Sequence, residues 1–244
     1  MIIRRLGSTD LLISQPEHAA LAARILRQWH PVHFPDSPRM ASILRAIEEH
    51  DSGWPEVDKA LVVDEATGQL LDFVELPDEI KRETASLGIE ILASDPYAAA
   101  LVAQHRLHVY RRFIDHPEWR GFFDAMKAAR DSHLRAAAEV SLPVLLRDYT
   151  FVRAGDLASL AFCNQWTEVD GDGCGYSMHL QGTSLFLTPD PFNGGTIEIA
   201  IDAREIDHQS FASAADARRV VASAAVVTLK GQVSGVIAGL SDLR

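Results

Sequence analysis

At residues 43–54 the chain reads ILRAIEEHDSGW. In a helix the apolar residues of this region share one face, and they are Met40, Ile43, Leu44 and Ile47. His50 and Asp51 continue that face, and Gly53 then ends the helix, so an imidazole and a carboxylate lie side by side and point toward the interior. A His-Asp pair is common by chance, and its meaning depends on the partners that other segments supply.

The composition is that of a globular protein of 244 residues, with 47% hydrophobic and 23% charged residues and no internal repeat. This length can bury a substantial core, either as one large domain or as a main domain with a small appendage. The formal net charge is -11 and the basic residues are scattered, which argues against nucleic-acid binding. Because no run approaches about 18 apolar residues and the start does not look like a leader, we expect a cytoplasmic protein without a membrane partner.

The motifs that are missing also narrow the chemistry. Cys163 and Cys174 form no CxxC pair, which excludes a zinc ribbon and gives no sign of a disulfide framework. The chain contains no phosphate loop, GxGxxG or GxSxG motif. Any bound metal would therefore need nitrogen and oxygen ligands.

Five helices are predicted, and each carries a metal-competent residue on its apolar face. They span about 15–29, 37–51, 95–114, 117–140 and 145–164, and the first begins with a capping box at Ser14 and Glu17. The metal-competent residues are His18, His50 with Asp51, His105, His133 and Asp156. Asp156 lies in the middle of an apolar stripe, where a carboxylate is costly unless it is paired or metal-bound.

The remaining segments predict less helix. Residues 1–13 predict a short strand or hairpin, and the acidic, proline-punctuated stretch 52–93 predicts a long packed loop with little regular structure. Strands are predicted at 184–187, 196–201 and 225–229, with a hairpin connection at 188–195. We therefore expect a mainly α protein, with a helical domain at 1–166 and a small C-terminal β-rich, α+β subdomain at 167–244 packed on it.

Several buried histidines on separate helices are satisfied best by each other or by a cation, although a single one is commonly an ordinary core residue. Neutral imidazoles and carboxylates suit Fe, Mn, Ni or Zn, as one or two divalent ions. Such an ion would lower the pKa of a bound water and hold a substrate oxygen.

The order of these residues resembles the HD superfamily of metal-dependent phosphohydrolases. His18, the His50-Asp51 pair and Asp156 match its pattern of a first His, a His-Asp pair and a distant Asp. Two further histidines, here His105 and His133, resemble the dinuclear members, which include phosphodiesterases and diiron oxygenases. The resemblance implies an HD-like helical bundle as the metal-binding domain, although the 52–93 insert departs from simple HD hydrolases.

A closer resemblance covers nearly the whole chain. The segments QPEHAALA at 15–22, EHDSGW at 49–54, DF at 72–73 and DLASL at 156–160 are similar to an uncharacterised bacterial family of unknown function. This likeness implies an HD-like helical core but brings no established reaction.

Two classes of function remain open. In the first, the protein is a hydrolase of a phosphate ester of a small molecule or nucleotide, with His50, Asp51 and His105 as catalytic residues. With iron, the same site would instead support oxygenase chemistry. In the second, the protein is a non-catalytic binding or regulatory module with a degenerate or structural site.

The enzyme hypothesis also names residues for the substrate. Gln15 and Trp54 are predicted substrate contacts at the mouth of the site. A cation is needed to neutralise phosphate, and the candidates are Arg106, Arg111, Arg112 and Lys59. The expected partner is a small-molecule substrate, and a homodimer is left open.

Overall fold

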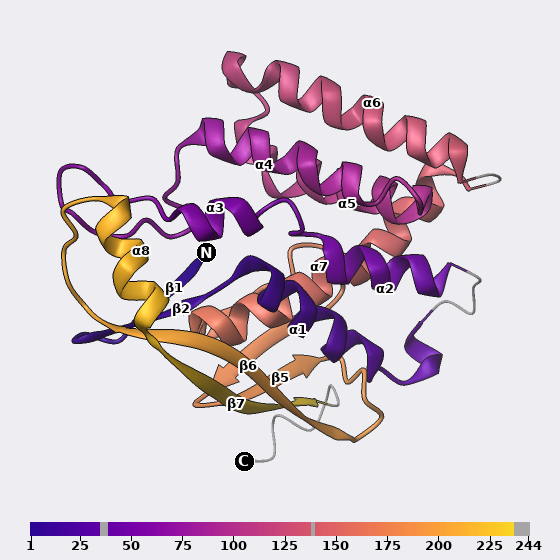
Figure 1. Ribbon diagram of the computed structural model, residues 1–244. Helices are drawn as coiled ribbons and strands as arrows, with labels where there is room; N and C mark the ends of the chain where they lie inside the picture. The colour runs from indigo at the N-terminus through magenta and orange to yellow at the C-terminus, as the bar shows by residue number, and fades with distance from the viewer. Residues whose placement is uncertain (35–38, 138–139, 237–244) are drawn as a thin grey trace.

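The computed structural model describes residues 1–34, 39–137 and 140–236. In Figure 1 a layer of helices lies over a twisted sheet, and α6 is the outermost helix. The α-helices are α1 (Gln15–Arg27), α2 (Met40–Glu49), α3 (Pro55–Ala60), α4 (Asp78–Ile91), α5 (Pro96–Val109), α6 (Arg120–Ala136), α7 (Leu142–Asn164) and α8 (Ala214–Ser223). The strands are β1 (Ile2–Arg5), β2 (Thr9–Ile13), β3 (Glu168–Val169), β4 (Ser177–Gln181), β5 (Ser184–Thr188), β6 (Thr196–Asp207) and β7 (Ala225–Gly235). Short 3-10 turns are η1 (Pro31–His33), η2 (Arg111–Phe113) and η3 (Pro117–Trp119).

Two predicted helix starts have the expected caps. The Ser14 hydroxyl accepts a hydrogen bond from the Glu17 amide at 3.3 Å, and the Asp95 carboxylate accepts one from the Ala98 amide at 3.1 Å. Each helix also has proline in its first turn, where the missing N–H costs nothing. The predicted helix start at Ser37 lies outside the described residues.

The seven strands form one sheet in the order β1-β2-β6-β7-β5-β4-β3, in which only β5 and β7 are parallel neighbours. The hairpin of β1 and β2 pairs with β6, with Asp10 opposite Ile206. The prediction of a mainly α protein built on a helical bundle is therefore wrong, and the chain is an α+β protein, whereas the predicted hairpin at 1–13 is present as β1 and β2. Its sheet joins residues from both ends of the sequence, a long-range pairing that local periodicity does not encode.

Alternation along β1 and β2 fills two cores at this end of the sheet. Ile2 and Ile13 pack into the main core with α1 and α7, whereas Ile3 and Leu12 face a second core that includes Val221 of α8. Both faces of the sheet are therefore covered here.

The predicted hairpin connection at 188–195 is also wrong. These residues join β5 to β6, but β7 lies between the two strands, so they are not paired with each other. After β6 the chain continues through α8 and then returns to the sheet as β7, which enters between β6 and β5.

Residues 52–93 contain more regular structure than predicted, because they include α3 and α4. The prolines mark helix starts here: Pro55 is the first residue of α3, and Pro77 immediately precedes α4. Ala85 and Ile89 of α4 are buried in the main core. A proline-punctuated segment was thus mistaken for a loop.

Helices α1, α2 and α7 pack against one another and bring four predicted ligands together. Gly155 lies at this crossing, where a Cβ atom would meet Leu26 of α1 at 2.9 Å and Ile47 of α2 at 3.0 Å. The absence of a side chain permits the close approach next to Asp156. None of the helices in the described part of the chain, including the long α7, is both extended and apolar enough to cross a membrane.

Candidate metal centre

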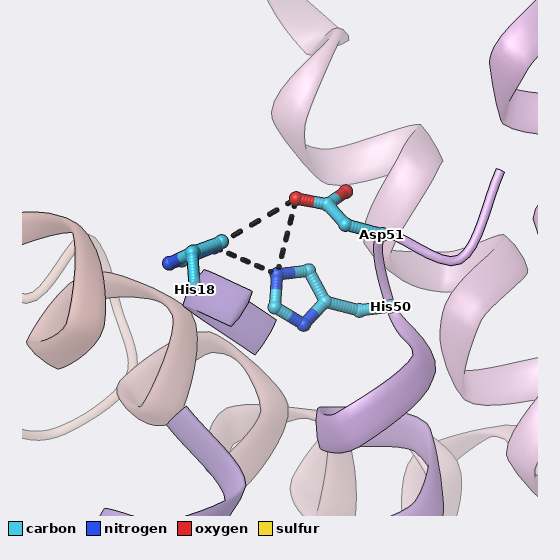
Figure 2. Close-up of side chains that lie close together, drawn as sticks. All are labelled: His18, His50 and Asp51. Carbon is cyan, nitrogen blue, oxygen red and sulfur yellow. Dashed lines mark hydrogen bonds and ion pairs between the residues drawn. The ribbon is translucent and has the colours of Figure 1, made fainter. Parts of the chain in front are cut away.

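Five of the six predicted ligands meet at one buried point between four helices. His18 comes from the first turn of α1, His50 and Asp51 follow the last turn of α2, His105 comes from α5, and Asp156 comes from α7. All five are buried, and His18 and His50 have no exposed surface. Figure 2 shows His18, His50 and Asp51 pointing toward one another.

The inner donor atoms form two overlapping groups that could hold an ion, His18 with His50 and Asp51, and His50 with His105 and Asp156. Within each group the atoms lie within 4.8 Å of one another. The Nε2 atoms of His18 and His50 are 3.1 Å apart, and the Oδ2 atom of Asp51 lies 3.7 Å and 3.5 Å from them. The Oδ1 atom of Asp156 lies 3.3 Å and 3.5 Å from the same two nitrogens. Ligands about 2.0–2.1 Å from a tetrahedral ion are roughly 3.3 Å from each other. Each carboxylate oxygen is therefore spaced from the two histidine nitrogens like a ligand that shares an ion with them.

The outer nitrogens of the two rings fix their tautomers. The Ser159 hydroxyl donates its one proton to the His18 carbonyl at 2.7 Å, so it must accept from His18 Nδ1, which is 2.8 Å away. His50 Nδ1 donates to the Ile47 carbonyl at 2.7 Å. In their unprotonated forms both rings thus present an Nε2 lone pair to the centre, which is how metal-binding histidines are oriented.

Two arginines hold the outer oxygens of the carboxylates. Arg106 donates to Asp51 Oδ1 at 3.0 Å and also to the His50 carbonyl, while Arg153 donates to Asp156 Oδ2 at 2.6 Å. The guanidinium groups leave Asp51 Oδ2 and Asp156 Oδ1 facing the histidines. Each carboxylate is thereby oriented with one oxygen toward the centre and one toward a fixed cation.

Burial and the neighbouring charges act in opposite directions on these groups. Burial disfavours the ionised carboxylates, but His50 and Arg106 outweigh it and lower the pKa of Asp51, while the neighbouring imidazoles and Arg153 lower that of Asp156 well below its usual value. Burial also disfavours the charged form of His50, but Asp51 and Asp156 outweigh it and raise its pKa. Both carboxylates are therefore ionised at neutral pH, as metal ligands must be.

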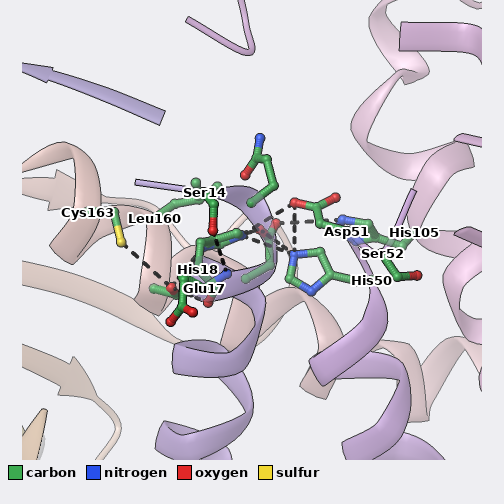
Figure 3. Close-up of polar contacts among 12 residues, drawn as sticks. Ser14, Glu17, His18, His50, Asp51, Ser52, His105, Leu160 and Cys163 are labelled. Carbon is green, nitrogen blue, oxygen red and sulfur yellow. Dashed lines mark hydrogen bonds and ion pairs between the residues drawn. The ribbon is translucent and has the colours of Figure 1, made fainter. Parts of the chain in front are cut away.

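His105 lies beside this group and differs from the other two histidines. Its Nε2 atom is 4.0 Å from Asp156 Oδ2, the oxygen that Arg153 already holds, and its Nδ1 is 3.3 Å from the Tyr149 hydroxyl. In Figure 3 it lies on the other side of His50 from His18. Burial lowers the pKa of His105 well below its ordinary value, so its ring is neutral.

The centre opens into a cavity of about 420 Å³. Its lining includes His18, Asp51, His105 and Asp156, together with the predicted substrate contacts Gln15 and Trp54. Five cationic side chains also line it, and they are Lys81, Arg106, Arg111, Arg112 and Arg153. Among the candidate cations, Lys59 does not line this cavity and pairs instead with Glu56 at 2.8 Å.

Several polar atoms around the cavity have no partner within the described residues. They are Gln15 Oε1, Trp54 Nε1, Arg106 Nε and Arg153 Nε. A buried donor or acceptor without a partner is costly, and such groups at a cavity are typical of ligand contacts. Gln15 and Trp54, which are almost fully buried, are therefore positioned to bind a polar ligand.

His133 does not join the other five residues. It lies on α6, which packs against α5 and forms the outer edge of the helical layer (Figure 1), and its side chain is partly exposed. The neighbour of α6 is α5, so the predicted core position of His133 does not bring it to the centre.

Sequence reasoning missed Arg153, Ser159 and Asp172 as functional residues. Arg153 and Ser159 lie three residues before and after Asp156, the spacing that places side chains on one face of a helix. This signal was available in the sequence. Asp172 lies in a glycine-rich turn, where helical phase gives no information.

The fold and the site define an α+β protein with a buried cluster of His and Asp side chains that could hold a metal ion. The chain belongs to the family described as "Protein of unknown function (DUF3891)", whose profile matches residues 1–209. No curated protein and no solved structure matches the chain.

Proposed function

We propose that this protein is a metal-dependent phosphohydrolase that holds one divalent ion with His18, His50, Asp51 and Asp156. The observation that carries the proposal is the spacing of their four inner donor atoms, 3.1–3.7 Å for the pairs that involve a histidine. The fixed Nδ1 protons of both histidines support the same assignment. The order of the four ligands, which resembles the HD superfamily, agrees with it.

One ion is favoured over two. The two groups of possible ligands share His50, whose Nδ1 already donates to the Ile47 carbonyl, so its one remaining nitrogen can bind only one ion. Arg106 and Arg153 hold the outer oxygens of Asp51 and Asp156, which are then not available to bridge two ions. His133, the other expected ligand of a second ion, lies on the outer helix α6. A diiron oxygenase therefore has less support than a mononuclear hydrolase.

A bound Fe, Mn, Ni or Zn ion would supply an activated water and polarise a phosphate oxygen. The chain's own residues supply the rest. The neutral His105 lies at the cavity wall, where its imidazole can accept a proton from the attacking water. Lys81 and Arg112 line the same cavity and neutralise the phosphate charge, while Gln15 and Trp54 offer a free acceptor and a free donor.

The cavity also bears on the class of substrate. A volume of about 420 Å³ lies in the range of small-molecule sites, and its cationic lining favours an anionic ligand over a neutral one. A phosphate ester of a small molecule or nucleotide fits this chemistry. The expected cytoplasmic setting, with two free buried thiols, remains part of the proposal.

The test is metal content, measured by mass spectrometry on protein purified without chelator or a metal-affinity tag. The wild type is compared with the double variant His50→Ala, Asp51→Ala and with His133→Ala as a matched control on another helix. We expect close to one equivalent of metal in the wild type and the control, and none in the double variant. Release of phosphate from a panel of phosphate esters should follow the metal, while oxygen consumption should stay at background.

Two results would change the conclusion. A folded wild type that contains no metal and takes up none of Fe, Mn, Ni or Zn on titration would leave a binding or regulatory module. Two equivalents of iron, with one lost in His133→Ala, would restore the dinuclear oxygenase hypothesis.

A further inference from the structure

Arg111 and Arg153, which line the same cavity, join His108 behind them in holding a carboxylate of the chain itself, that of Asp172. Asp172 accepts hydrogen bonds from Arg111 Nη2 at 2.7 Å, from Arg153 Nη2 at 3.0 Å and from His108 Nε2 at 2.8 Å. We call His108, Arg111 and Arg153 the anion clamp. Two guanidinium groups and an imidazole converge here on one carboxylate, an arrangement typical of binding sites for oxyanions.

The clamp and its carboxylate come from different parts of the fold. His108 is in the last turn of α5, Arg111 begins η2 directly after it, and Arg153 is in α7. Asp172 belongs to the turn between β3 and β4. The clamp is therefore built on two packed helices, whereas the anion that fills it is carried by a turn.

Asp172 is held in place mainly by its side chain. Its carboxylate is about one-third exposed (31%), and its φ of 47° lies in the left-handed region, which is unfavourable for a non-glycine residue. The Cys174 amide closes the turn by donating to the Gly171 carbonyl at 2.8 Å. Rotation of the Asp172 side chain can therefore empty the clamp while the turn keeps its own backbone bond.

Arg153 connects the clamp to the proposed metal centre. Its Nη1 donates to the ligand Asp156 and its Nη2 donates to Asp172. The clamp and the proposed metal centre are thus joined through a single guanidinium group. One small molecule in the cavity can therefore reach both.

We propose that the anion clamp binds a second anionic group of the substrate and that Asp172 is the internal anion which this group displaces. This inference rests on the proposed function and narrows it: the substrate is a small molecule with a phosphate ester at one end and a carboxylate or second phosphate at the other. Asp172 occupies the clamp when no substrate is bound and gives the two arginines that line the cavity, Arg111 and Arg153, a counter-charge.

The test measures binding of inorganic phosphate and of malonate to the full chain by calorimetry, with and without bound metal. The variants are Asp172→Asn, the double variant Asp172→Asn, Arg111→Gln, and Asp170→Asn as a matched control from the same turn. Asp172→Asn removes the competing charge but keeps the shape, and it should bind the anions at least about tenfold more tightly than wild type. The double variant should lose this gain, and Asp170→Asn should bind as wild type does. The stronger of the two anions identifies the second group as phosphate or carboxylate.

Equal or weaker anion binding by Asp172→Asn would overturn the proposal, because it would make Asp172 a structural partner of Arg153 and Arg111. A second measurement uses only wild-type protein, so it does not depend on whether the variant folds. Saturating anion should increase the hydrogen exchange of residues 170–176 as Asp172 leaves the clamp. Unchanged exchange would also overturn the proposal. The metal-free arm separates this outcome from failure of the proposed function, since the clamp is then tested without any ion or turnover.

Discussion

The Nε2 atoms of His18 and His50 face each other at 3.1 Å, although the surrounding hydrogen bonds place the protons of both neutral rings on Nδ1. Two lone pairs at this distance repel unless a proton or a metal ion lies between them. A proton would join the two rings, but it would leave Asp51 Oδ2, which is 3.7 Å and 3.5 Å from the two nitrogens, without a close donor. An ion would bind both nitrogens and Asp51 Oδ2 together.

Metal should therefore stabilise the folded protein. At a free concentration one hundred times its dissociation constant, an ion that binds only the native state adds about 2.7 kcal/mol. For a chain of this size that corresponds to a rise in Tm of roughly 5–11 °C. Thermal unfolding of chelator-treated protein, before and after addition of Mn, Zn or Fe(II), measures it. His18→Ala should abolish the rise and His133→Ala should retain it, and a rise that survives in His18→Ala would contradict the assigned ligands.

Arg106 should stabilise the site through Asp51. Its side chain is buried and pairs with Asp51 Oδ1, so Arg106→Met would leave a buried carboxylate without its partner. Loss of one partner of a buried ion pair typically costs about 3–5 kcal/mol. Urea unfolding measures this loss, and competitive titration should show about 10–100-fold weaker metal binding. Arg106→Lys keeps the charge but loses the forked guanidinium group that also reaches the His50 carbonyl. Its stability and its metal affinity should therefore lie between those of wild type and Arg106→Met.

Gly53 is predicted to be intolerant of a side chain for a reason that the sequence did not reveal. The α2 helix already ends at Glu49, and Gly53 instead packs directly against α4, where a Cβ atom would collide with the Thr84 carbonyl. Gly53→Ala should cost about 1–3 kcal/mol, because only backbone movement relieves the contact. Gly121→Ala, on an exposed and open position of α6, is the matched control and should leave stability unchanged or slightly raised. Chemical denaturation of the two variants gives the comparison, and an equal stability of both would contradict the close packing of α4.

The site could be predicted further than the fold because its signals are local. His18, Asp51 and Asp156 were found from helical phase and helix caps, each of which involves residues within a few positions of one another. The pairing of β2 with β6 joins Leu11 to Glu205, and the insertion of β7 beside β5 depends on the path of the whole C-terminal region. No local pattern encodes either of these two pairings. The sequence therefore predicts most of the strands but not the order in which they form the sheet.

Helical phase identifies the face that is buried but not what covers it. Helix α6 packs on α5, so His133 lies away from the cluster although, like His18 and Asp156, it is placed by helical phase on an apolar face. The same limit applies to the cations around the cavity. Arg111 and Arg112 line it and Lys59 does not, a distinction that depends on where α3 and α5 lie in space.

The two cysteines should be inert in the native protein. Cys163 is fully buried in α7, and burial raises the pKa of its thiol to about 12; burial also raises the pKa of Cys174. Because the thiolate is the reactive form, neither residue should react with a disulfide reagent at pH 8 until the protein unfolds. A colorimetric thiol assay with and without denaturant measures both. Rapid reaction of one thiol in the native state would show that the region around that cysteine opens.

The ion pairs of Asp172 should make part of the stability depend on pH. Burial opposes ionisation of Asp172, but the hydrogen bonds from His108 and Arg153 outweigh it and lower its pKa to about 2. A lowered carboxylate pKa contributes stability that is present above the unfolded-state pKa, near 4, and is lost as pH falls toward the folded-state value. Because the side chain is partly exposed, we expect about 1–2 kcal/mol at pH 6.

The difference in unfolding free energy between wild type and Asp172→Asn isolates this contribution, since the other carboxylates titrate in both proteins. It should favour wild type at pH 6 and shrink by about half at pH 3. Asp170→Asn, whose carboxylate is exposed, should show no such trend. A constant difference between pH 6 and pH 3 would mean that Asp172 stabilises the turn through its backbone and not through its charge, and the same variant would then be expected to bind anions no more tightly than wild type.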